Sequence, residues 1–283
     1  MQINNFYRLL SIGALLLLAG CSPPYESIDE QHWVGQESGL RFSTFDEDGD
    51  HQAMFVVESG RRDKQMVLFL HGTPGSWQGY VEYLQNTVLS ARAHLVAMDR
   101  IGFGKSDHGR VPPFKLQAAS LIRLQSLNKS GKPIIVVGHS LGGSLGYRMA
   151  IDYPSQIAGL LVISASVDPE LGKARWYNQM ASYRALNWLL PSNLMKANIE
   201  IMPLQNELQA MQPLLSGIRS RVTVIHGEQD KLVDFGNLAF ATAALKGAQL
   251  NTVALADSGH FILWEEPAIV TKALIALLDA PTD

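Results

Sequence analysis

The stretch "VVGHSLGGSLG", from Val136 to Gly146, decides the fold, because an apolar run ends there at a serine between glycines. Gly138 to Gly142 match the pattern G-x-S-x-G, and the residues that follow are helix-like. A nucleophilic serine must stand above its sheet, which forces the chain into a tight turn that leaves room only for glycine on either side. We therefore identify Ser140 as a candidate nucleophile, and Gly138 and Gly142 as the residues that form its turn.

The composition limits the kind of protein. The chain has 283 residues, 47% of them apolar, and a formal net charge of −3. This length and apolar content suit one large α/β domain with a sizeable core. Charges of one sign do not cluster along the chain, so the sequence gives no reason to expect a nucleic-acid partner.

The first residues resemble a bacterial lipoprotein signal peptide. Arg8 precedes an apolar run of about 12 residues, shorter than the ~20 that a membrane-spanning helix needs. The sequence "LLAGC", from Leu17 to Cys21, then resembles a lipobox, which implies cleavage before Cys21 and lipid attachment to this single cysteine of the chain. The alternative is an ordinary signal peptide, or an uncleaved anchor, with an incidental cysteine.

The lipobox also implies a location and a domain boundary. Ser22, rather than aspartate, follows the cysteine, which implies a place in the bacterial cell envelope at the outer membrane, facing the periplasm. We expect residues 1–20 to be the signal peptide and the polar residues 21–35 to tether the folded domain to the membrane.

The rest of the chain alternates between strand-like and helix-like segments. Residues 40–45 and 52–57 predict an opening antiparallel hairpin around the turn sequence "DEDGD". Continuous, largely apolar runs, typical of parallel strands buried on both faces, follow at 66–70, 94–98, 134–137, 159–163, 222–225 and 251–255. Helix-length segments lie between them at 77–90, 114–126, 141–153, 237–245 and 267–278. The alternation predicts an α/β fold with a mostly parallel, doubly wound sheet.

One long interval breaks this alternation. More than fifty residues separate Ser164 from Arg221, and no convincing strand lies between them. Pro191, Pro203 and Pro213 divide the interval into short pieces suited to helices, and a structureless loop of this length is rare in a compact domain. We expect a helical cap at residues 167–213, inserted after the sixth strand between core segments 36–166 and 214–283. Two ordinary crossover helices are the alternative.

A serine nucleophile needs a base, and the base needs an acid that orients it. His260, in "DSGHFILWEEP", begins a loop after the last predicted strand, whereas the other histidines lie early in the chain or have no loop free to reach Ser140. Asp230, in "HGEQD", follows the preceding strand and is the candidate acid. Of the competing acids, Asp99 is expected to anchor its turn with Arg100, and Asp257 to cap its local loop.

The attacked oxygen also needs donors for its negative charge, each worth about 2.7–4 kcal/mol. The loop "HGTPGS", from His71 to Ser76, follows the strand 66–70 and offers the amide of Thr73. Leu141, directly after the candidate nucleophile, offers a second amide. A plain β-turn built on Pro74 and Gly75 is the alternative interpretation of this loop.

Together these segments resemble the α/β-hydrolase superfamily, of the capped, esterase-like or proline-iminopeptidase-like kind. The resemblance runs from about Phe42 to Leu278 and includes "HGTPGS", "DRIGFGKSD", "VGHSLGG", "HGEQD" and "SGHFILWEEP", in the family's order. It implies Ser140 as nucleophile, His260 as general base and Asp230 as the orienting acid. It also implies Thr73 and Leu141 as oxyanion donors, with neither a metal nor an organic cofactor.

The resemblance implies a serine hydrolase that acts on an ester-like small molecule through an acyl-enzyme. A carboxylesterase for small or medium apolar substrates is the expected activity, since the predicted cap is rich in aromatic residues and methionine. Ser140 stands where epoxide hydrolases and haloalkane dehalogenases of this fold have aspartate. An aminopeptidase remains an alternative, with Glu170, Glu200 or Glu207 holding the substrate amine. An acyltransferase and a non-catalytic binding lipoprotein are further alternatives, and the sequence does not predict the oligomeric state.

Overall fold

The computed structural model of the chain describes residues 39–46, 53–106, 109–183 and 190–281. The predicted signal peptide, Cys21, the tether and most of the turn "DEDGD" lie outside these residues. Within the described ranges, no helix is both long and apolar enough to cross a membrane.

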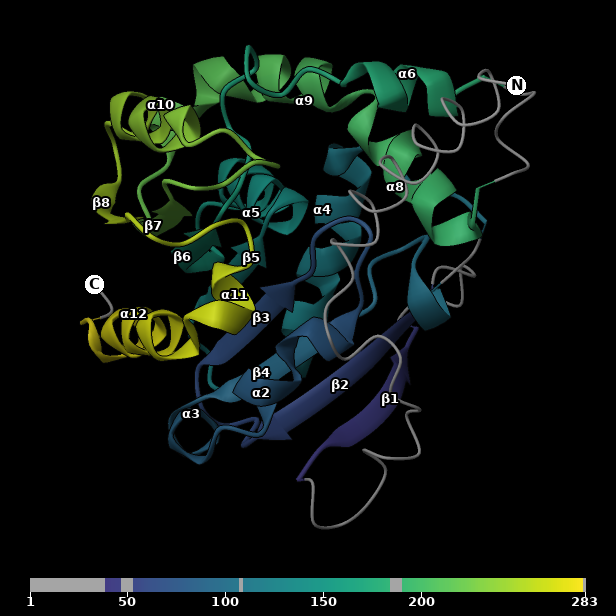
Figure 1. The fold of residues 1–283 in the computed structure, drawn as a ribbon. Coiled ribbons are helices and arrows are strands. Elements are labelled where there is room, and N and C mark those ends of the chain that lie inside the picture. Colours follow the sequence, from purple (N-terminus) through teal and green to yellow (C-terminus); the bar gives the residue numbers. More distant parts are fainter. Residues whose placement is uncertain (1–38, 47–52, 107–108, 184–189, 282–283) are drawn as a thin grey trace, which may run out of the picture.

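A single eight-stranded sheet, in the order β1-β2-β4-β3-β5-β6-β7-β8, forms the centre of the described molecule (Figure 1). β1 and β2 form the predicted antiparallel hairpin, β2 also runs antiparallel to β4, and the remaining neighbours are parallel. The strands are β1 (Arg41–Phe45), β2 (Met54–Gly60), β3 (Met66–Leu70), β4 (His94–Met98), β5 (Ile134–His139), β6 (Ile157–Ile163), β7 (Arg221–Gly227) and β8 (Gln249–Leu255). The mostly parallel, doubly wound sheet is confirmed.

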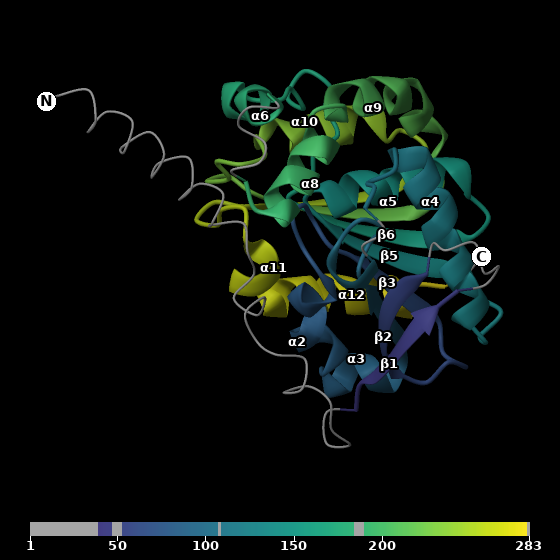
Figure 2. The same ribbon diagram turned by 90° about the vertical axis from the view of Figure 1, so that its right-hand side faces the viewer.

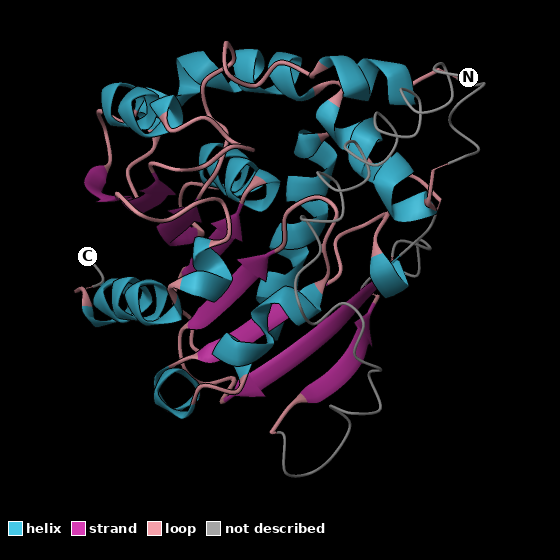
Figure 3. Cartoon of the chain, in the orientation of Figure 1, coloured by secondary structure: helices cyan, strands magenta, loops and turns pink. Residues whose placement is uncertain are grey.

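Helices cover both faces of this sheet (Figures 2 and 3). Along β3, Val67 and Phe69 pack into the core on one face, and Leu68 and Leu70 pack into the core on the other. This two-sided burial explains why inner strands such as β3 and β5 are apolar throughout. The prediction of burial on both faces is wrong for β8, an edge strand in which Asn251 and Thr252 are exposed. One layer holds α2 (Val81–Leu84), α3 (Thr87–Arg92), α11 (Ile262–Glu265) and α12 (Pro267–Asp279), and the other holds α4 (Phe114–Ile122), α5 (Leu141–Asp152) and α10 (Gly236–Ala244).

The single helix predicted at residues 77–90 is wrong. The segment divides into a 3-10 turn, η3 (Trp77–Tyr80), and the short helices α2 and α3. Asn86 causes the second break, because its side chain accepts hydrogen bonds from the amides of Val88 and Leu89 and so caps α3. The segment predicted at 114–126 likewise ends in a 3-10 turn, η5 (Arg123–Leu127), after α4.

A helical insert lies between β6 and β7, as predicted. It contains α6 (Trp176–Ala181), α8 (Ser192–Ile201) and α9 (Leu204–Met211), and it is followed by the 3-10 turn η6 (Gln212–Gly217). Pro191 and Pro203 directly precede α8 and α9, and Pro213 lies in the first turn of η6, so the prolines begin these segments. The insert crosses the end of the sheet where the parallel strands finish (Figure 1). We call it the cap.

Candidate active site

Ser140 occupies a strained turn between β5 and α5. Its φ of 54° lies in the left-handed region, which costs a non-glycine residue about 1–3 kcal/mol. The Ser140 amide donates to the carbonyl oxygen of Ile163 at 2.9 Å, and close backbone contacts at the neighbouring glycines also hold the turn in this conformation. A Cβ at Gly142 would lie 2.1 Å from the Leu70 carbonyl oxygen, and one at Gly138 would lie 2.4 Å from the Gly142 carbonyl oxygen. Only glycine fits at either position.

Asp230 and His260 form a buried pair beside this turn. The Nδ1 atom of His260 lies 2.8 Å from Oδ2 of Asp230, and the other carboxylate oxygen accepts the amides of Leu232 and Val233, each at 2.8 Å. Burial alone would raise the pKa of Asp230, but hydrogen bonds from His226 and His260 outweigh it and hold that pKa well below its ordinary value. The carboxylate therefore binds the Nδ1 proton of His260 and leaves Nε2 free to act as an acceptor.

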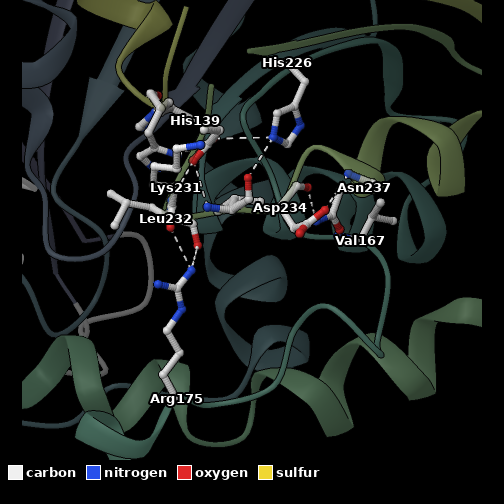
Figure 4. Close-up of polar contacts among 12 residues, drawn as sticks. His139, Val167, Arg175, His226, Lys231, Leu232, Asp234 and Asn237 are labelled. Carbon is white, nitrogen blue, oxygen red and sulfur yellow. Dashed lines mark hydrogen bonds and ion pairs between the residues drawn. The ribbon is translucent and has the colours of Figure 1, made fainter. Parts of the chain in front are cut away.

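His226 is a member of this group that the sequence analysis missed. Its Nε2 lies 3.1 Å from the Val233 carbonyl oxygen and 3.4 Å from Oδ2 of Asp230. Since a carbonyl only accepts, Nε2 carries a proton and donates toward both oxygens. Figure 4 shows His226 beside the loop after β7. Its place at the end of β7, four residues before Asp230, is the signal that could have identified it.

His139 supports the loop that carries His260. Its Nε2 donates to the carbonyl oxygen of His260 at 2.9 Å, and its ring packs 4.8 Å from the His260 ring and 4.9 Å from Trp264, centroid to centroid. Burial, followed by the charge of His260, lowers the pKa of His139 to about 3. His139 is therefore a neutral donor that holds the backbone of His260 in place.

The loop after β3 lies directly against Ser140. A Cβ at Gly72 would be 3.1 Å from the Cβ of Ser140. His71 fixes this loop, since Nδ1 donates to the Gly72 carbonyl oxygen at 2.8 Å and Nε2 accepts the Arg100 amide at 2.9 Å. Burial and the charge of Arg100 lower the pKa of His71, which keeps Nε2 an acceptor. Leu141 is the first residue of α5, where helical amides have no partner within the helix.

The turn at Ser140, the loop after β3 and the loop of His260 all border one cavity of about 160 Å³. Ser140, His260, Thr73 and Leu141 all line it, whereas Asp230 lies behind His260 and is not part of the wall. No aspartate or glutamate belongs to the described lining. The cap contributes Leu171, Gly172, Lys173, Arg175, Tyr177, Asn178, Ala197, Ile201 and Leu204. The loop after β8 contributes Phe261, and α11 contributes Leu263 and Trp264.

The competing acids lie elsewhere. Asp99 accepts the amides of Trp77 and Lys105, each at 2.9 Å, so it anchors its turn as predicted. The predicted partner Arg100 instead pairs its guanidinium with Glu200 of the cap. Asp257 is exposed. In the part of the chain that the structure describes, no cluster of three histidine, cysteine or acidic side chains could hold a metal ion.

The three glutamates considered as amine anchors are already bound. Glu200 pairs with Arg100 at 2.6 Å and is buried. Glu207 accepts the amide of Phe114 at 3.2 Å, and Glu170 pairs with Lys173 at 2.7 Å on the surface. None of them lines the cavity, so the geometry gives no support to their predicted role in binding a substrate amine.

Comparison with known proteins identifies the family and the fold of the chain. Mouse epoxide hydrolase 4 is 29% identical over 131 residues (46% of this chain, 33% of that protein), and human monoglyceride lipase is 28% identical over 134 residues (46% and 44%). The chain thus spans less than half the length of these curated relatives. A bacterial membrane phospholipase A has the same fold, with a TM-score of 0.65, 18% identity and coverage of 96% of this chain and 98% of that one. Residues 67–273 match the profile of the alpha/beta hydrolase family. The chain therefore belongs to the alpha/beta hydrolase family.

Proposed function

We propose that the protein is a serine hydrolase that cleaves carboxylic esters with apolar acyl groups, through an acyl-enzyme on Ser140. One observation carries the proposal: the strained turn at Ser140 opens on the same cavity as His260, and Nδ1 of His260 is bound at 2.8 Å by a buried carboxylate. An imidazole nitrogen, Nε2, with no partner in the described structure and a serine side chain on the same cavity are the parts that nucleophilic catalysis requires.

The reaction proceeds in two steps. Oγ of Ser140 attacks the ester carbonyl carbon while Nε2 of His260 takes the hydroxyl proton, and the carbonyl electrons move onto oxygen. The amides of Thr73 and Leu141 bind this oxyanion. The oxyanion collapses and breaks the bond to the alcohol, which leaves with the proton from His260. Water then attacks the acyl-enzyme in the same manner and releases the acid, and Asp230 stabilises the imidazolium formed in each step.

An apolar, uncharged acyl group suits the cavity. The predicted apolar content of the cap divides between two surfaces: Tyr177 and Ile201 line the cavity, whereas Trp176 and Met180 are exposed. With no carboxylate in the described lining, a substrate amine would find no ionic partner, which favours the esterase over the aminopeptidase. The names of monoglyceride lipase and of the membrane phospholipase A also point to lipid esters.

The test compares Ser140→Ala with Ser76→Ala, since both serines line the cavity. With p-nitrophenyl acetate, butyrate and octanoate as substrates, Ser140→Ala should lower kcat by at least about 10,000-fold, and Ser76→Ala by about threefold at most. Adding an acceptor alcohol, or proline β-naphthylamide, separates acyl transfer and aminopeptidase activity from hydrolysis. Ester hydrolysis that survives in folded Ser140→Ala would refute the proposal.

We further propose that Cys21 carries the lipid anchor and holds the domain at the outer membrane, facing the periplasm. The sequence of residues 17–21 supports this, and several acyl chains bury enough methylenes, at about 0.8 kcal/mol each, to hold a folded domain on a bilayer. Cys21→Ala should move the protein to the soluble fraction with its esterase activity intact. Mass spectrometry that finds Cys21 unmodified, or a mature chain that starts elsewhere, would contradict the anchor.

A further inference from the structure

A buried arginine lies behind the loop that carries Thr73. Arg100 follows β4, and its side chain is fully buried. Its Nε donates to the His71 carbonyl oxygen at 3.0 Å and its Nη2 to the Gly72 carbonyl oxygen at 2.9 Å. The first carbonyl belongs to the peptide group between His71 and Gly72, and the second to the peptide group between Gly72 and Thr73.

The second of these contacts bears directly on Thr73. The carbonyl of Gly72 and the amide of Thr73 belong to one planar peptide group, in which the C=O and N–H bonds point in opposite directions. A guanidinium that holds the carbonyl oxygen therefore fixes the direction in which the Thr73 amide points. Its positive charge also polarises the peptide group, which makes the amide a stronger donor.

The cap holds Arg100 in turn. Glu200, in α8, receives Nη1 at 2.6 Å and Nη2 at 2.9 Å on its two carboxylate oxygens, and its side chain is 1% exposed. Gln117 of α4 completes the group, accepting from Nη1 and donating to Glu200, each at 2.7 Å. Such a two-pronged contact fixes both the distance and the plane of the guanidinium.

A second arginine repeats the arrangement at the acid loop, as Figure 4 shows. Nη2 of Arg175, at the start of α6, donates to the carbonyl oxygens of Lys231 and Leu232 at 2.8 and 3.0 Å. The amides in these same two peptide groups belong to Leu232 and Val233, which both hold Oδ1 of Asp230. The cap thus reaches peptide groups in two loops of the site, through Arg100 at the loop of Thr73 and directly through Arg175 at the loop of Asp230.

We propose that the cap orients the catalytic peptide groups, with Glu200 acting through Arg100 as a positioning residue for the Thr73 amide. A buried ion pair contributes little net stability over an apolar replacement, so stability alone gives no reason for this one. An arginine left without its carboxylate is free to turn or to draw in water, and either change releases the Gly72 carbonyl. The cap therefore encloses the cavity and also orients the amide of Thr73, which stabilises the transition state.

The matched pair of variants is Glu200→Gln and Glu207→Gln. Both remove one cap carboxylate, but Glu207 contacts the amide of Phe114 and not the loop of Thr73. With p-nitrophenyl butyrate, Glu200→Gln should lower kcat by about 10- to 100-fold with KM within about threefold, and Glu200→Asp should recover part of the loss. Glu207→Gln should stay within about twofold of wild type.

A boronic acid separates positioning from general loosening, because its serine adduct places an oxygen where the oxyanion forms. The affinity of Glu200→Gln for butylboronic acid should fall by the same factor as kcat/KM, while its affinity for butyrate stays unchanged. An unchanged kcat in Glu200→Gln, or an equal loss of boronate and butyrate affinity, would overturn the inference.

Hydrogen exchange on the wild-type chain covers the case in which Glu200→Gln fails to fold. Since coupling between two sites is reciprocal, a phosphonate adduct on Ser140 should slow amide exchange in α8 more than in α10. Equal exchange with and without the adduct would also overturn the inference.

This inference rests on the proposed function, and the two fail differently. A wild-type chain without esterase activity would refute the proposed function. An active chain that keeps its activity in Glu200→Gln would refute only the positioning role of the cap.

Discussion

The cavity has two sides that are built in different ways. The core side consists of the turn at Ser140, the loop of Thr73 and the pair of His260 with Asp230. Close backbone contacts hold the turn, and hydrogen bonds from buried side chains to nearby backbone hold the loops. The cap side consists of α6, α8 and α9, and long-range side-chain contacts such as Arg100 with Glu200 hold it to the core. A tight backbone turn requires particular residues, such as glycine, that can be recognised in the local sequence. A contact between side chains far apart in the chain has no such local pattern.

The two sides also differ in what disturbs them. The core side depends on close approach of main chain to main chain, so added volume is the most damaging change. The cap side packs Leu204, Leu208 and Met211 of α9 into the apolar core, and it adds charged contacts such as that of Glu200 with Arg100, which removal of a charge tests separately. Variants that add volume on one side or remove charge from the other test this difference.

The largest effect is expected from Gly142→Ala. Its new Cβ would lie 2.1 Å from the Leu70 carbonyl oxygen, which forces α5 away from β3 and distorts the turn at Ser140. We expect kcat to fall by at least about 100-fold and the free energy of unfolding to fall by about 3 kcal/mol. Denaturant unfolding and ester hydrolysis measure the two effects.

Gly146→Ala, one turn further along α5, is the matched control. Its Cβ would meet Val136 at an ordinary 3.5 Å, so this variant should keep its activity and gain up to about 1 kcal/mol from helix propensity. If the two variants behave alike, the core side does not depend on close backbone approach.

An intermediate effect is expected from pH, and it acts on the core side. Burial lowers the pKa of His71 well below its ordinary value and that of His139 to about 3, so both stay neutral in the folded protein. Below pH 6.5 the unfolded chain binds protons that the folded chain does not, so stability is full above pH 6.5 and falls as the pH drops. Between pH 7 and pH 5 His139 should remove about 2 kcal/mol from the free energy of unfolding, and His71 should act in the same direction.

Urea unfolding over this pH range checks the prediction. The slope of the free energy of unfolding against pH gives the number of protons taken up on unfolding. In His139→Gln this number should fall by about one, because one of the two buried imidazoles is gone. A slope that does not change in this variant would mean that His139 titrates normally in the folded state.

The smallest effect is expected from Arg175→Ala, on the cap side. Arg175 is exposed, so water can replace part of its contact with the Lys231 and Leu232 carbonyls. We expect kcat for p-nitrophenyl butyrate to fall by about threefold. Lys173→Ala is the control, because Lys173 also lines the cavity but pairs only with Glu170 in the described structure. Equal activities in the two variants would restrict positioning by the cap to Glu200.

The same difference explains how much the sequence could predict. The strands and the turn at Ser140 follow from local patterns of apolar runs and glycines. The order Ser140, Asp230, His260 is what the resemblance to α/β-hydrolases implies, and Asp230 and His260 both follow predicted strands. Glu200 gave no such signal, because its partner Arg100 lies 100 residues away and an acidic residue on a helix is usually solvated. The break at Asn86 was missed because an asparagine caps one helix or interrupts another according to its surroundings.

Covalent labelling of the full-length protein with a fluorophosphonate, followed by peptide mapping, tests most directly whether Ser140, His260 and Asp230 work as one site. The account predicts one equivalent of adduct on the peptide containing Ser140, and labelling at least about 1,000-fold slower in His260→Ala. Labelling at another residue, or labelling of Ser140 at an undiminished rate in His260→Ala, would contradict it.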